Sequence, residues 1–301
     1  MQNKSVVTVI CMCYNHEKFV LESLHSVITQ DYPFIELIII DDCSTDDSKN
    51  TIEKWLLDYP KVQFIANETN LGNTKSFNKA LKLASGDYII DLATDDVLIS
   101  NCVSLQIKAF TESTFKNLGI VYGNAELITE KGEFDSYYFP VNDNKKTIKK
   151  RQTGDIYLSV LSGGDSICSV SSMAKKSVYN LLNGYDETLA YEDLDFWIRS
   201  SRLYEFDFID EILIKKRISA TSLTTSFYDN HSSRFKKINR STYLILKKAI
   251  GLNQTNEEDL AVQKRVHHEM VHTFKIKDYS LFLKNTGLRF WLFWRKNFKK
   301  H

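Results

Sequence analysis

Long apolar runs are missing from this sequence of 301 residues, and their absence limits what the protein can be. A helix that spans a membrane needs about 20 consecutive apolar residues, whereas the densest apolar stretch, residues 35–40, has the length of a strand. The first residues, Met-Gln-Asn-Lys-Ser, also lack the apolar core of a secretory signal. We therefore expect a cytoplasmic protein in which the five cysteines are reduced thiols.

Sequence signatures of several common enzyme classes are absent as well. The chain has no Gly-x-Gly-x-x-Gly and no Walker sequence, which disfavours dinucleotide-binding and P-loop enzymes. Hydrophobic residues make up 43% and charged residues 26% of the chain. These proportions are typical of a globular protein with a sizeable core, and they exclude a disordered, collagen-like or disulfide-stapled chain.

The charge of the chain is unevenly distributed. The formal net charge is +1, yet residues 231–301 hold 16 Lys and Arg against 5 Asp and Glu, a net +11. Residues 1–230 hold the other 23 basic and 33 acidic residues, a net −10. A basic end on an acidic body is typical of proteins whose basic part meets an anionic membrane surface or nucleic acid.

Strand-like and helix-like patterns alternate over the first 130 residues. Strands are expected at residues 6–13, 36–40, 62–66, 88–93 and 119–123, and helices at residues 19–30, 48–59, 74–84 and 101–114. This alternation predicts an α/β fold with a doubly wound, mostly parallel sheet. Residues 130–160 have the polar composition of a surface loop, and the pattern beyond residue 227 is helical and basic. We therefore expect one domain at residues 1–226 and a helical extension at residues 227–301.

Polar residues follow several of the expected strands at the point where each strand ends. They are Tyr14 and Asn15, Asp41 and Asp42, residues 67–70, and Asp95 and Asp96. In open α/β sheets the carboxyl ends of the strands form the ligand-binding edge. A surplus of carboxylates beside a phosphate-bearing ligand requires a divalent cation between them. Helix capping and turn formation are the alternative, and they explain one Asp at each place better than two adjacent pairs.

Five short motifs follow one another along the chain. They are Val-Ile-Cys-Met-Cys-Tyr-Asn at residues 9–15, Ile-Ile-Ile-Asp-Asp-Cys-Ser-Thr-Asp at 38–46, Asn70-Leu-Gly72 with Asn78, Ser-Gly-Asp-Tyr-Ile at 85–89 with Ala-Thr-Asp-Asp at 93–96, and Gly-Tyr-Asp-Glu at 184–187 with Glu-Asp-Leu-Asp-Phe-Trp at 192–197. In this order they resemble the motifs of a family 2 glycosyltransferase of the GT-A fold. The resemblance covers roughly residues 5–225.

The resemblance implies an inverting, metal-dependent transferase that moves one sugar from a nucleotide diphosphate donor, UDP-linked, to a saccharide. The implied cofactor is Mn2+ or Mg2+, and the implied setting is the assembly of a bacterial surface polysaccharide such as capsule or lipopolysaccharide. The implied catalytic base is Asp193, and the implied metal ligand is Asp96. The implied nucleotide-sugar-binding residues are Cys13, Tyr14, Asn15, Asp42, Asn70, Gly72, Asn78, Asp95 and Arg217.

The chemistry of these side chains agrees with the implied roles. A Tyr at a strand end can stack on a nucleobase, and the acceptor-only carboxylates of Asp42 and Asp95 suit a base N–H and ribose hydroxyls. An Asp is ionised at neutral pH, so Asp193 is ready to take a proton from an acceptor hydroxyl. Its alternative role is to start a helix, where an acidic residue is favoured by the helix dipole.

The chain departs from the family pattern in three places. Cys43 stands where the family has Gly, which removes a residue free to adopt a positive φ. The sequence around Asp95 and Asp96 is not a strict Asp-x-Asp, so the ribose and metal roles could be exchanged. Many relatives carry a His late in the domain, whereas here Lys216 and Arg217 are the candidates to serve the diphosphate. The Gln-x-x-Arg-Trp sequence of processive synthases is also absent, which favours the addition of single sugars.

Three other functions compete with this interpretation. A sugar nucleotidyltransferase would need a Gly-rich basic loop after the first strand, and residues 14–17 are not such a loop. A degenerate transferase that acts as an assembly subunit would have no use for the acidic residues. His268, Glu269 and His272 fit the His-Glu-x-x-His pattern of zinc-dependent hydrolases, although a third ligand is not evident nearby.

The last stretch, residues 288–300, interleaves five aromatic with five basic residues. On a helix, Trp291, Trp294 and Phe298 fall on one face and Arg289, Lys296 and Lys300 fall opposite. Two interpretations stay open: peripheral contact with an anionic membrane, which suits a lipid-linked saccharide acceptor at the inner face of the plasma membrane, or docking of the aromatics on the body. Nucleic acid is not expected, because the body is acidic, and the oligomeric state is left open.

Overall fold

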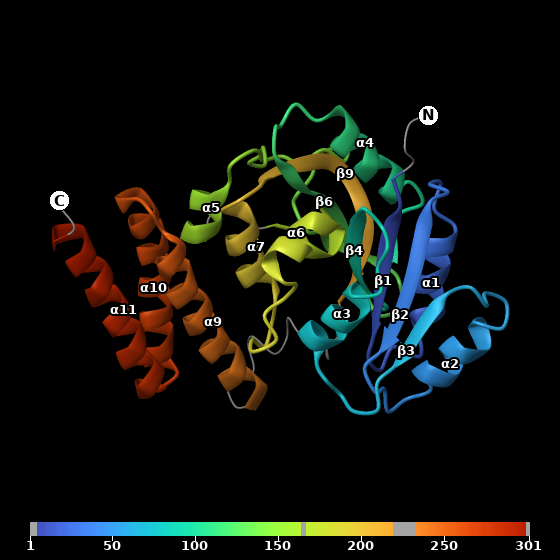
Figure 1. Cartoon of the computed structure of the whole chain (residues 1–301), viewed down its shortest axis with the longest axis horizontal. Helices are drawn as coiled ribbons and strands as arrows, with labels where there is room; N and C mark the ends of the chain where they lie inside the picture. The colour runs from blue at the N-terminus through green and yellow to red at the C-terminus, as the bar shows by residue number, and fades with distance from the viewer. Residues whose placement is uncertain (1–4, 164–166, 219–232, 299–301) are drawn as a thin grey trace. The chain divides into compact units, whose positions relative to one another are not determined.

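The structure, a computed structural model, describes residues 5–163, 167–218 and 233–298. These residues divide into two units (Figure 1). The first unit comprises described residues up to 154, residues 167–185 and residues 204–218. The second comprises residues 155–163, 186–203 and 233–298. The expected boundary at residue 226 lies outside the described residues, and the second unit takes residues 186–203 in addition to the helical end of the chain.

A mixed sheet forms the centre of the first unit. Its strands are β1 (Val7–Cys13), β2 (Ile35–Asp41), β3 (Gln63–Ala66), β4 (Tyr88–Ala93), β5 (Val97–Leu98), β6 (Leu118–Ile128), β7 (Phe134–Tyr137), β8 (Met173–Lys175) and β9 (Glu205–Arg217). The spatial order is β3-β2-β1-β4-β8-β6-β9-β5, with β7 beside β6. The first four strands in this order are mutually parallel, and β8 then runs antiparallel to both β4 and β6. The predicted α/β sheet, mostly parallel in its first half, is confirmed.

Buried β-branched and aliphatic side chains explain why the parallel strands form. All seven residues of β1 are buried, as expected for a central strand covered on both faces. The first unit also holds α1 (Val20–Ile28), α2 (Ser48–Trp55), α3 (Asn73–Leu81), α4 (Cys102–Glu112), α6 (Lys176–Leu182) and a short 3-10 helix, η1 (Ser169–Ser171). Val20, Leu24 and Val27 form the buried stripe of α1 and pack on one face of the sheet with residues of α2 and α4. The predicted helices are present, and each is a few residues shorter than its periodicity indicates.

The polar stretch at residues 130–160 differs from the expected surface loop. It contains β7, which pairs antiparallel with β6 and so extends the sheet. Asn124 of β6 holds the chain that follows β7. Its side chain accepts a hydrogen bond from Phe139 N and donates one to Phe139 O, both at 2.8 Å. The sequence pattern missed β7 because the strand is only four residues long and none of its side chains is fully buried.

Helices make up the second unit. They are α5 (Tyr157–Ser162), α7 (Asp193–Ser201), α9 (Ser233–Leu252), α10 (Asn256–Lys275) and α11 (Tyr279–Phe298). The start of α10 has a capping box, in which Thr255 and Glu258 exchange side-chain to backbone hydrogen bonds. The face of α11 that carries Leu281, Leu288 and Leu292 is buried. In the part of the chain that the structure describes, no helix has both the length and the hydropathy to cross a bilayer.

Gly184 lies where a side chain cannot fit, and this position gives a test of the first unit. Its φ is +73°, and a Cβ there would lie 2.3 Å from Oδ1 of Asn78. We expect Gly184→Ala to lower the free energy of unfolding by about 2 kcal/mol or more, measured by denaturant unfolding. Gly287→Ala in α11, with no atom within 4 Å of the added Cβ, is the control and should be neutral or stabilising. Equal midpoints for Gly184→Ala and wild type would contradict the packing described.

Candidate functional site

Two loops at the carboxyl ends of β1 and β2 are tied together by hydrogen bonds. Asn15, with a φ of 59°, accepts a hydrogen bond from Thr45 N at 2.7 Å, and its own N–H donates to Ser44 Oγ at 2.9 Å. The N–H of His16 donates to Ser48 Oγ at 2.9 Å. The side chain of Asn15 therefore joins the two loops, and its expected contact with the nucleotide stays a prediction.

The carboxylate of Asp42 organises the neighbouring loop after β3. One oxygen accepts hydrogen bonds from Asn67 Nδ2, Leu71 N and Ser76 Oγ at 2.8–2.9 Å, and the other accepts one from Gly72 N at 2.8 Å. The side chain of Asn70 donates to the backbone oxygen of Asp42 at 3.1 Å. Asp42, Asn70 and Gly72, which the sequence singled out separately, are thus one hydrogen-bonded group.

Asn78 connects the motif that starts at Asn70 to the motif that starts at Gly184. Its side chain accepts a hydrogen bond from Tyr185 N and donates one to Tyr185 O, both at 2.9 Å. Asn78 is buried, and both ends of its amide are used by this backbone. Asn78 therefore holds the backbone of Tyr185, and its expected nucleotide contact stays a prediction.

The turn between β4 and β5 carries Asp95 and Asp96, and Arg217 at the end of β9 holds it. The N–H of Arg217 donates to Asp96 Oδ1 at 2.8 Å, and its Nε donates to the backbone oxygen of Asp95 at 3.0 Å. The rest of the guanidinium donates to the backbone oxygens of Thr129 and Glu130 and, at 2.7 Å, to the carboxylate of Glu22.

The guanidinium of Arg217 is consequently committed to groups of the protein. The residue is 3% exposed, and the guanidinium also lies over the ring of Phe19 at 4.4 Å. With these partners Arg217 positions the turn of Asp95 and Asp96, and its expected contact with the diphosphate stays a prediction. Lys216, the other candidate, is half-buried, lies with Nζ 5.9 Å from the ring of Tyr138, and acts to lower the pKa of Asp96.

Asp96 is buried with its negative charge poorly compensated. Burial and then the charge of Asp95 hold the pKa of Asp96 well above its usual range, although Arg217 and Lys216 act in the opposite direction. Among the described residues, no three His, Cys, Asp or Glu side chains are grouped as a complete metal site. Two adjacent carboxylates still fit Mg2+ or Mn2+, because these ions are commonly held by one or two carboxylates together with substrate phosphates.

Tyr14 and His16 also lie at this edge, and His16 was not singled out from the sequence. Tyr14 follows β1 and is 45% exposed, as base stacking would require. His16 lies with Nδ1 2.9 Å from Thr94 Oγ1 and Nε2 3.8 Å from Asp95 Oδ2, so it faces the acidic turn. Its place directly after Tyr14 and Asn15 was the only signal available. Cys13, by contrast, is 2% exposed, and burial raises the pKa of its thiol to about 11, so its side chain belongs to the core.

Asp193 is the first residue of α7 and belongs to the second unit. The helix begins there as predicted, with Asp193 and Asp195 in its first turn, where carboxylates are favoured by the helix dipole. The segment before it, residues 186–192, is described with the same unit.

The alternative zinc motif lies on α10 in the second unit. The rings of His268 and His272 are parallel with centroids 6.4 Å apart, and the side chain of His268 is 75% exposed. Glu269 contacts His268 at 3.2 Å. Because no third ligand joins them among the described residues, this pair lacks the protein ligands that a zinc hydrolase needs.

A parallel sheet of order 3-2-1-4 with carboxylates at its carboxyl edge, continued through an antiparallel strand into a second parallel pair, matches the architecture of the GT-A glycosyltransferases. The structure resembles S. aureus TarS 1-349 in complex with UDP-GlcNAc, with a TM-score of 0.67 and 16% identity over 93% of this chain and 79% of that one. It also resembles the mannosyltransferase PcManGT of Pyrobaculum calidifontis in complex with GDP-Man and Mn2+, with a TM-score of 0.57 and 12% identity over 96% and 88% of the two chains. At these identities the likeness shows the fold alone.

Sequence comparison gives the family. The model of Glycosyl transferase family 2 matches residues 8–173, more than half of the chain. An uncharacterized glycosyltransferase of Methanocaldococcus jannaschii is 30% identical over 81% of this chain and 79% of its own length. Chondroitin synthase of Escherichia coli is 25% identical over 78% of this chain but only 32% of its own length. The chain belongs to glycosyl transferase family 2.

The raised pKa of Asp96 makes the metal-free protein less stable when this carboxyl is ionised. The stabilising protonated form is fully present below the ordinary Asp pKa of about 4 and is lost as the pH rises through the higher pKa of the folded state. Asp96→Asn removes the charge and keeps an acceptor for Arg217 N. In EDTA we expect this variant to unfold at higher denaturant concentration than wild type at pH 8, with a smaller difference at pH 4.

Asp143→Asn is the control for this measurement, because Asp143 is exposed and lies in a surface turn. It should leave the unfolding midpoint nearly unchanged at both pH values. An Asp96→Asn variant that is less stable than wild type at pH 8 would show that the carboxylate is compensated in the folded protein.

Proposed function

We propose that the protein transfers one sugar from a nucleoside diphosphate donor, UDP-linked, to a saccharide or lipid-linked saccharide, with inversion at the anomeric carbon. The observation that carries this proposal is that Asp96 is buried beside Asp95 and has a raised pKa, at the carboxyl edge of the parallel strands of a GT-A sheet. We call this edge the donor edge. Bacterial surface polysaccharide assembly is the setting that we propose from the family resemblance. The donors named for the structural neighbours, UDP-GlcNAc and GDP-Man, support a nucleotide sugar.

Residues of the donor edge are proposed to bind different parts of the donor. Tyr14 stacks on the base, Asp95 accepts hydrogen bonds from the ribose hydroxyls, and Asp96 holds Mn2+ or Mg2+, which neutralises charge on the diphosphate when bound. Asp42 fixes the loop beside the base and accepts a base N–H through its second oxygen. Lys216 takes the place of Arg217 as the cation that faces the diphosphate, because the guanidinium of Arg217 already has protein partners.

Asp193 is proposed as the general base. Its carboxylate takes the proton of the acceptor hydroxyl while that oxygen attacks the anomeric carbon. The bond between the anomeric carbon and the β-phosphate oxygen breaks with both electrons on the oxygen, and the nucleoside diphosphate leaves. One displacement without a covalent intermediate inverts the configuration.

Calorimetric titration with UDP, GDP, CDP and dTDP, each with and without Mn2+, tests the donor edge. We expect one nucleotide, UDP, to bind at least tenfold more tightly with Mn2+, because the cation joins the carboxylates to the diphosphate. Asp96→Ala should abolish the effect of manganese. Glu53→Ala, an exposed carboxylate on α2, is the control and should bind as wild type. An affinity for the nucleotide that changes neither with manganese nor in Asp96→Ala would contradict the metal assignment.

Asp193→Asn separates proton abstraction from donor binding. The amide keeps the size of the side chain but cannot take a proton, so we expect kcat to fall 100-fold or more while the affinity for the nucleotide stays within a factor of two. The measurement is sugar transfer with the donor that the titration selects, with the anomeric configuration of the product read by NMR. Full transfer by Asp193→Asn, or a product of retained configuration, would show that another group or another mechanism acts.

The exposed face of α11 supports the membrane contact that we propose for the second unit. Its buried face packs through Leu281, Leu288 and Leu292, so the helix docks in part on its own unit. The aromatic residues lie on the other face: Trp291 is 42%, Trp294 49% and Phe290 69% exposed. Phe298 of the expected aromatic face, and Lys296 and Lys300 of the expected basic face, fall outside the side chains that the structure describes.

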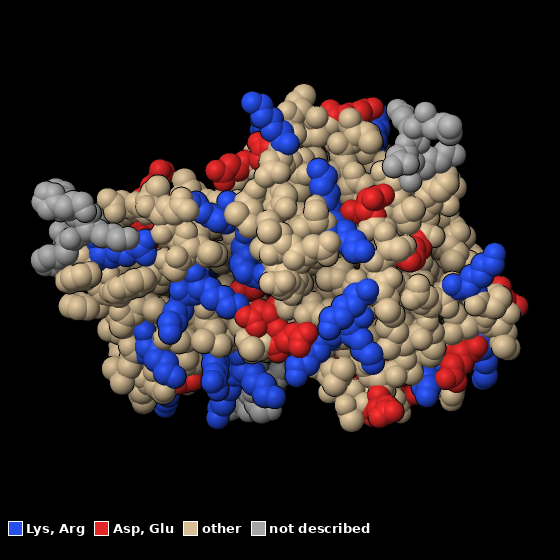
Figure 2. Space-filling model, viewed as in Figure 1, with Lys and Arg blue, Asp and Glu red and all other residues tan. Residues whose placement is uncertain are grey.

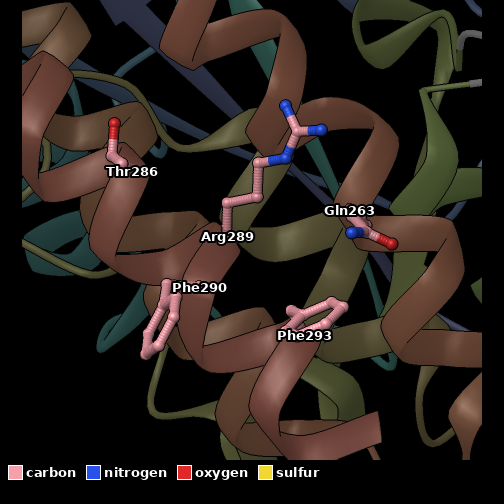
Figure 3. A pocket seen from close by; sticks show the side chains of 5 residues that line it. All are labelled: Gln263, Thr286, Arg289, Phe290 and Phe293. Carbon is pink, nitrogen blue, oxygen red and sulfur yellow. The ribbon is translucent and has the colours of Figure 1, made fainter. Parts of the chain in front are cut away.

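A shallow apolar pocket of about 380 Å3 adjoins this face between α10 and α11 (Figure 3). Phe290 and Phe293 line it from α11 and Gln263 from α10, with Arg289 at the same place. Lys and Arg side chains gather over the second unit in the space-filling view (Figure 2). Aromatic side chains flanked by cations fit the interface of an anionic bilayer, where the rings enter the headgroup region and the cations meet lipid phosphates.

Vesicle sedimentation tests the proposed contact. We expect wild type to bind vesicles that contain phosphatidylglycerol, with binding weakened by salt, and a Trp291→Ala, Trp294→Ala double variant to bind at least tenfold less. Leu57→Ala, at an 81% exposed apolar residue of the first unit, is the control. Wild type that stays in the supernatant at low salt would refute the contact, and a concentration-dependent dimer lost in the double variant would assign the face to a second copy of the chain.

A further inference from the structure

The segment that leads into α7 is held by one face of α9, within the second unit. Ser241 Oγ accepts a hydrogen bond from the backbone N–H of Ala190 at 2.8 Å. The hydroxyls of Tyr191 and Thr242 lie 2.8 Å apart. Because Ser241 and Thr242 are buried, these contacts hold the backbone of Ala190 and the side chain of Tyr191, three and two residues before Asp193.

Lys248 lies about two helical turns beyond Ser241 on α9. It contacts one residue that precedes Asp193 in the sequence and one that follows it. Its Nζ lies 2.9 Å from Asp195 Oδ1 and also contacts the carboxylate of Asp186. Although burial acts to raise it, the hydrogen bond from Lys248 lowers the pKa of Asp186 to about 2. Asp195 is 2% exposed, and its second oxygen accepts a hydrogen bond from Arg199 Nε at 2.6 Å.

Three residues of α9, Ser241, Thr242 and Lys248, therefore form what we call the α9 clamp. Ser241 and Lys248 are seven residues apart and share a helix face. The residues that they hold, from Asp186 to Asp195, bracket Asp193. Two cations, Lys248 and Arg199, balance the two carboxylates Asp186 and Asp195, so the start of α7 does not accumulate uncompensated charge from these four groups.

We propose that the α9 clamp positions Asp193 for catalysis, with Lys248 as its central positioning residue. The clamp gives the basic helix α9 a role in the reaction, in addition to any contact of the second unit with a membrane. This inference rests on the proposed function only in taking Asp193 as the base. Without Lys248, Asp195 stays buried beside one cation instead of two, and Asp186 loses its anchor, so the first turn of α7 shifts. A shift of about 1 Å at a catalytic group can cost on the order of 100-fold in rate.

Hydrogen exchange of the full-length protein tests the clamp without any substrate. We compare Lys248→Met with Lys247→Met, since Lys247 is the neighbouring exposed residue of α9. In Lys248→Met we expect amides in residues 186–195 to exchange about tenfold faster than in wild type. Peptides that cover β1, residues 7–13, should be unchanged and serve as the internal control. Unchanged exchange at residues 186–195 would overturn the clamp.

Steady-state kinetics then test whether the clamp serves catalysis. We expect Lys248→Met to lower kcat 10- to 100-fold with the affinity for the nucleotide unchanged, and Lys248→Arg to recover most of kcat because it keeps the cation. A kcat equal to that of Lys247→Met, despite faster exchange, would overturn the positioning role. Wild type without transfer from any nucleotide sugar would count against the proposed function, while the exchange result would still decide whether the clamp exists.

Discussion

The donor edge of the first unit depends on one buried cation, the guanidinium of Arg217. Burial of a charged group costs several kcal/mol unless it is fully partnered, and here the partners are the carboxylate of Glu22, three backbone oxygens and the ring of Phe19. Through its own N–H and Nε, the same residue fixes the turn of Asp95 and Asp96. The acidic turn is thereby held in one conformation before any ligand arrives.

This rigidity keeps the carboxyl group of Asp96 buried beside that of Asp95. A carboxylate that is buried beside another would normally be relieved by movement of the turn toward solvent, but Arg217 prevents it. The folded protein instead keeps a group whose pKa is raised. In the function that we propose, a divalent cation and the diphosphate of the donor compensate the charge of Asp96, and this compensation contributes to donor binding.

The residues of the family motifs form two groups: some direct their polar atoms to the protein backbone, and others leave their side chains exposed. Asn15, Asp42, Asn78 and Arg217 use theirs on the backbone of neighbouring loops. Tyr14 is left exposed on the edge that they shape. In the second unit the α9 clamp applies the same principle to a segment with a proposed base, because buried donors and acceptors fix the backbone around Asp193. In both arrangements the segments become ordered when the protein folds, so the entropic cost of ordering them is not added to the free energy of binding.

The sequence predicted strands β1 to β4 and β6 and the polar residues that follow several of them, because these depend on local periodicity. It assigned Asn78 and Arg217 to the nucleotide because a motif gives residue types without their partners. Those partners, Tyr185 and Glu22, are 107 and 195 positions away. Position 43, by contrast, could be anticipated from the motif. The family has Gly there, which indicates a positive φ, and Cys43 adopts a φ of 61°.

The division into two units could not be anticipated from composition. The basic helices mark the end of the chain, yet residues 186–203 belong with them and carry Asp193. Only the contacts of Asp186 and Asp195 with Lys248 reveal this, since no periodicity links the segments.

Anomalous diffraction from a crystal grown with Mn2+ and UDP tests the account most directly. We expect one manganese peak at the carboxylate of Asp96, in contact with the diphosphate, and the uracil stacked on Tyr14. UDP bound at this edge with no manganese at Asp96, or manganese bound only elsewhere in the chain, would contradict the account.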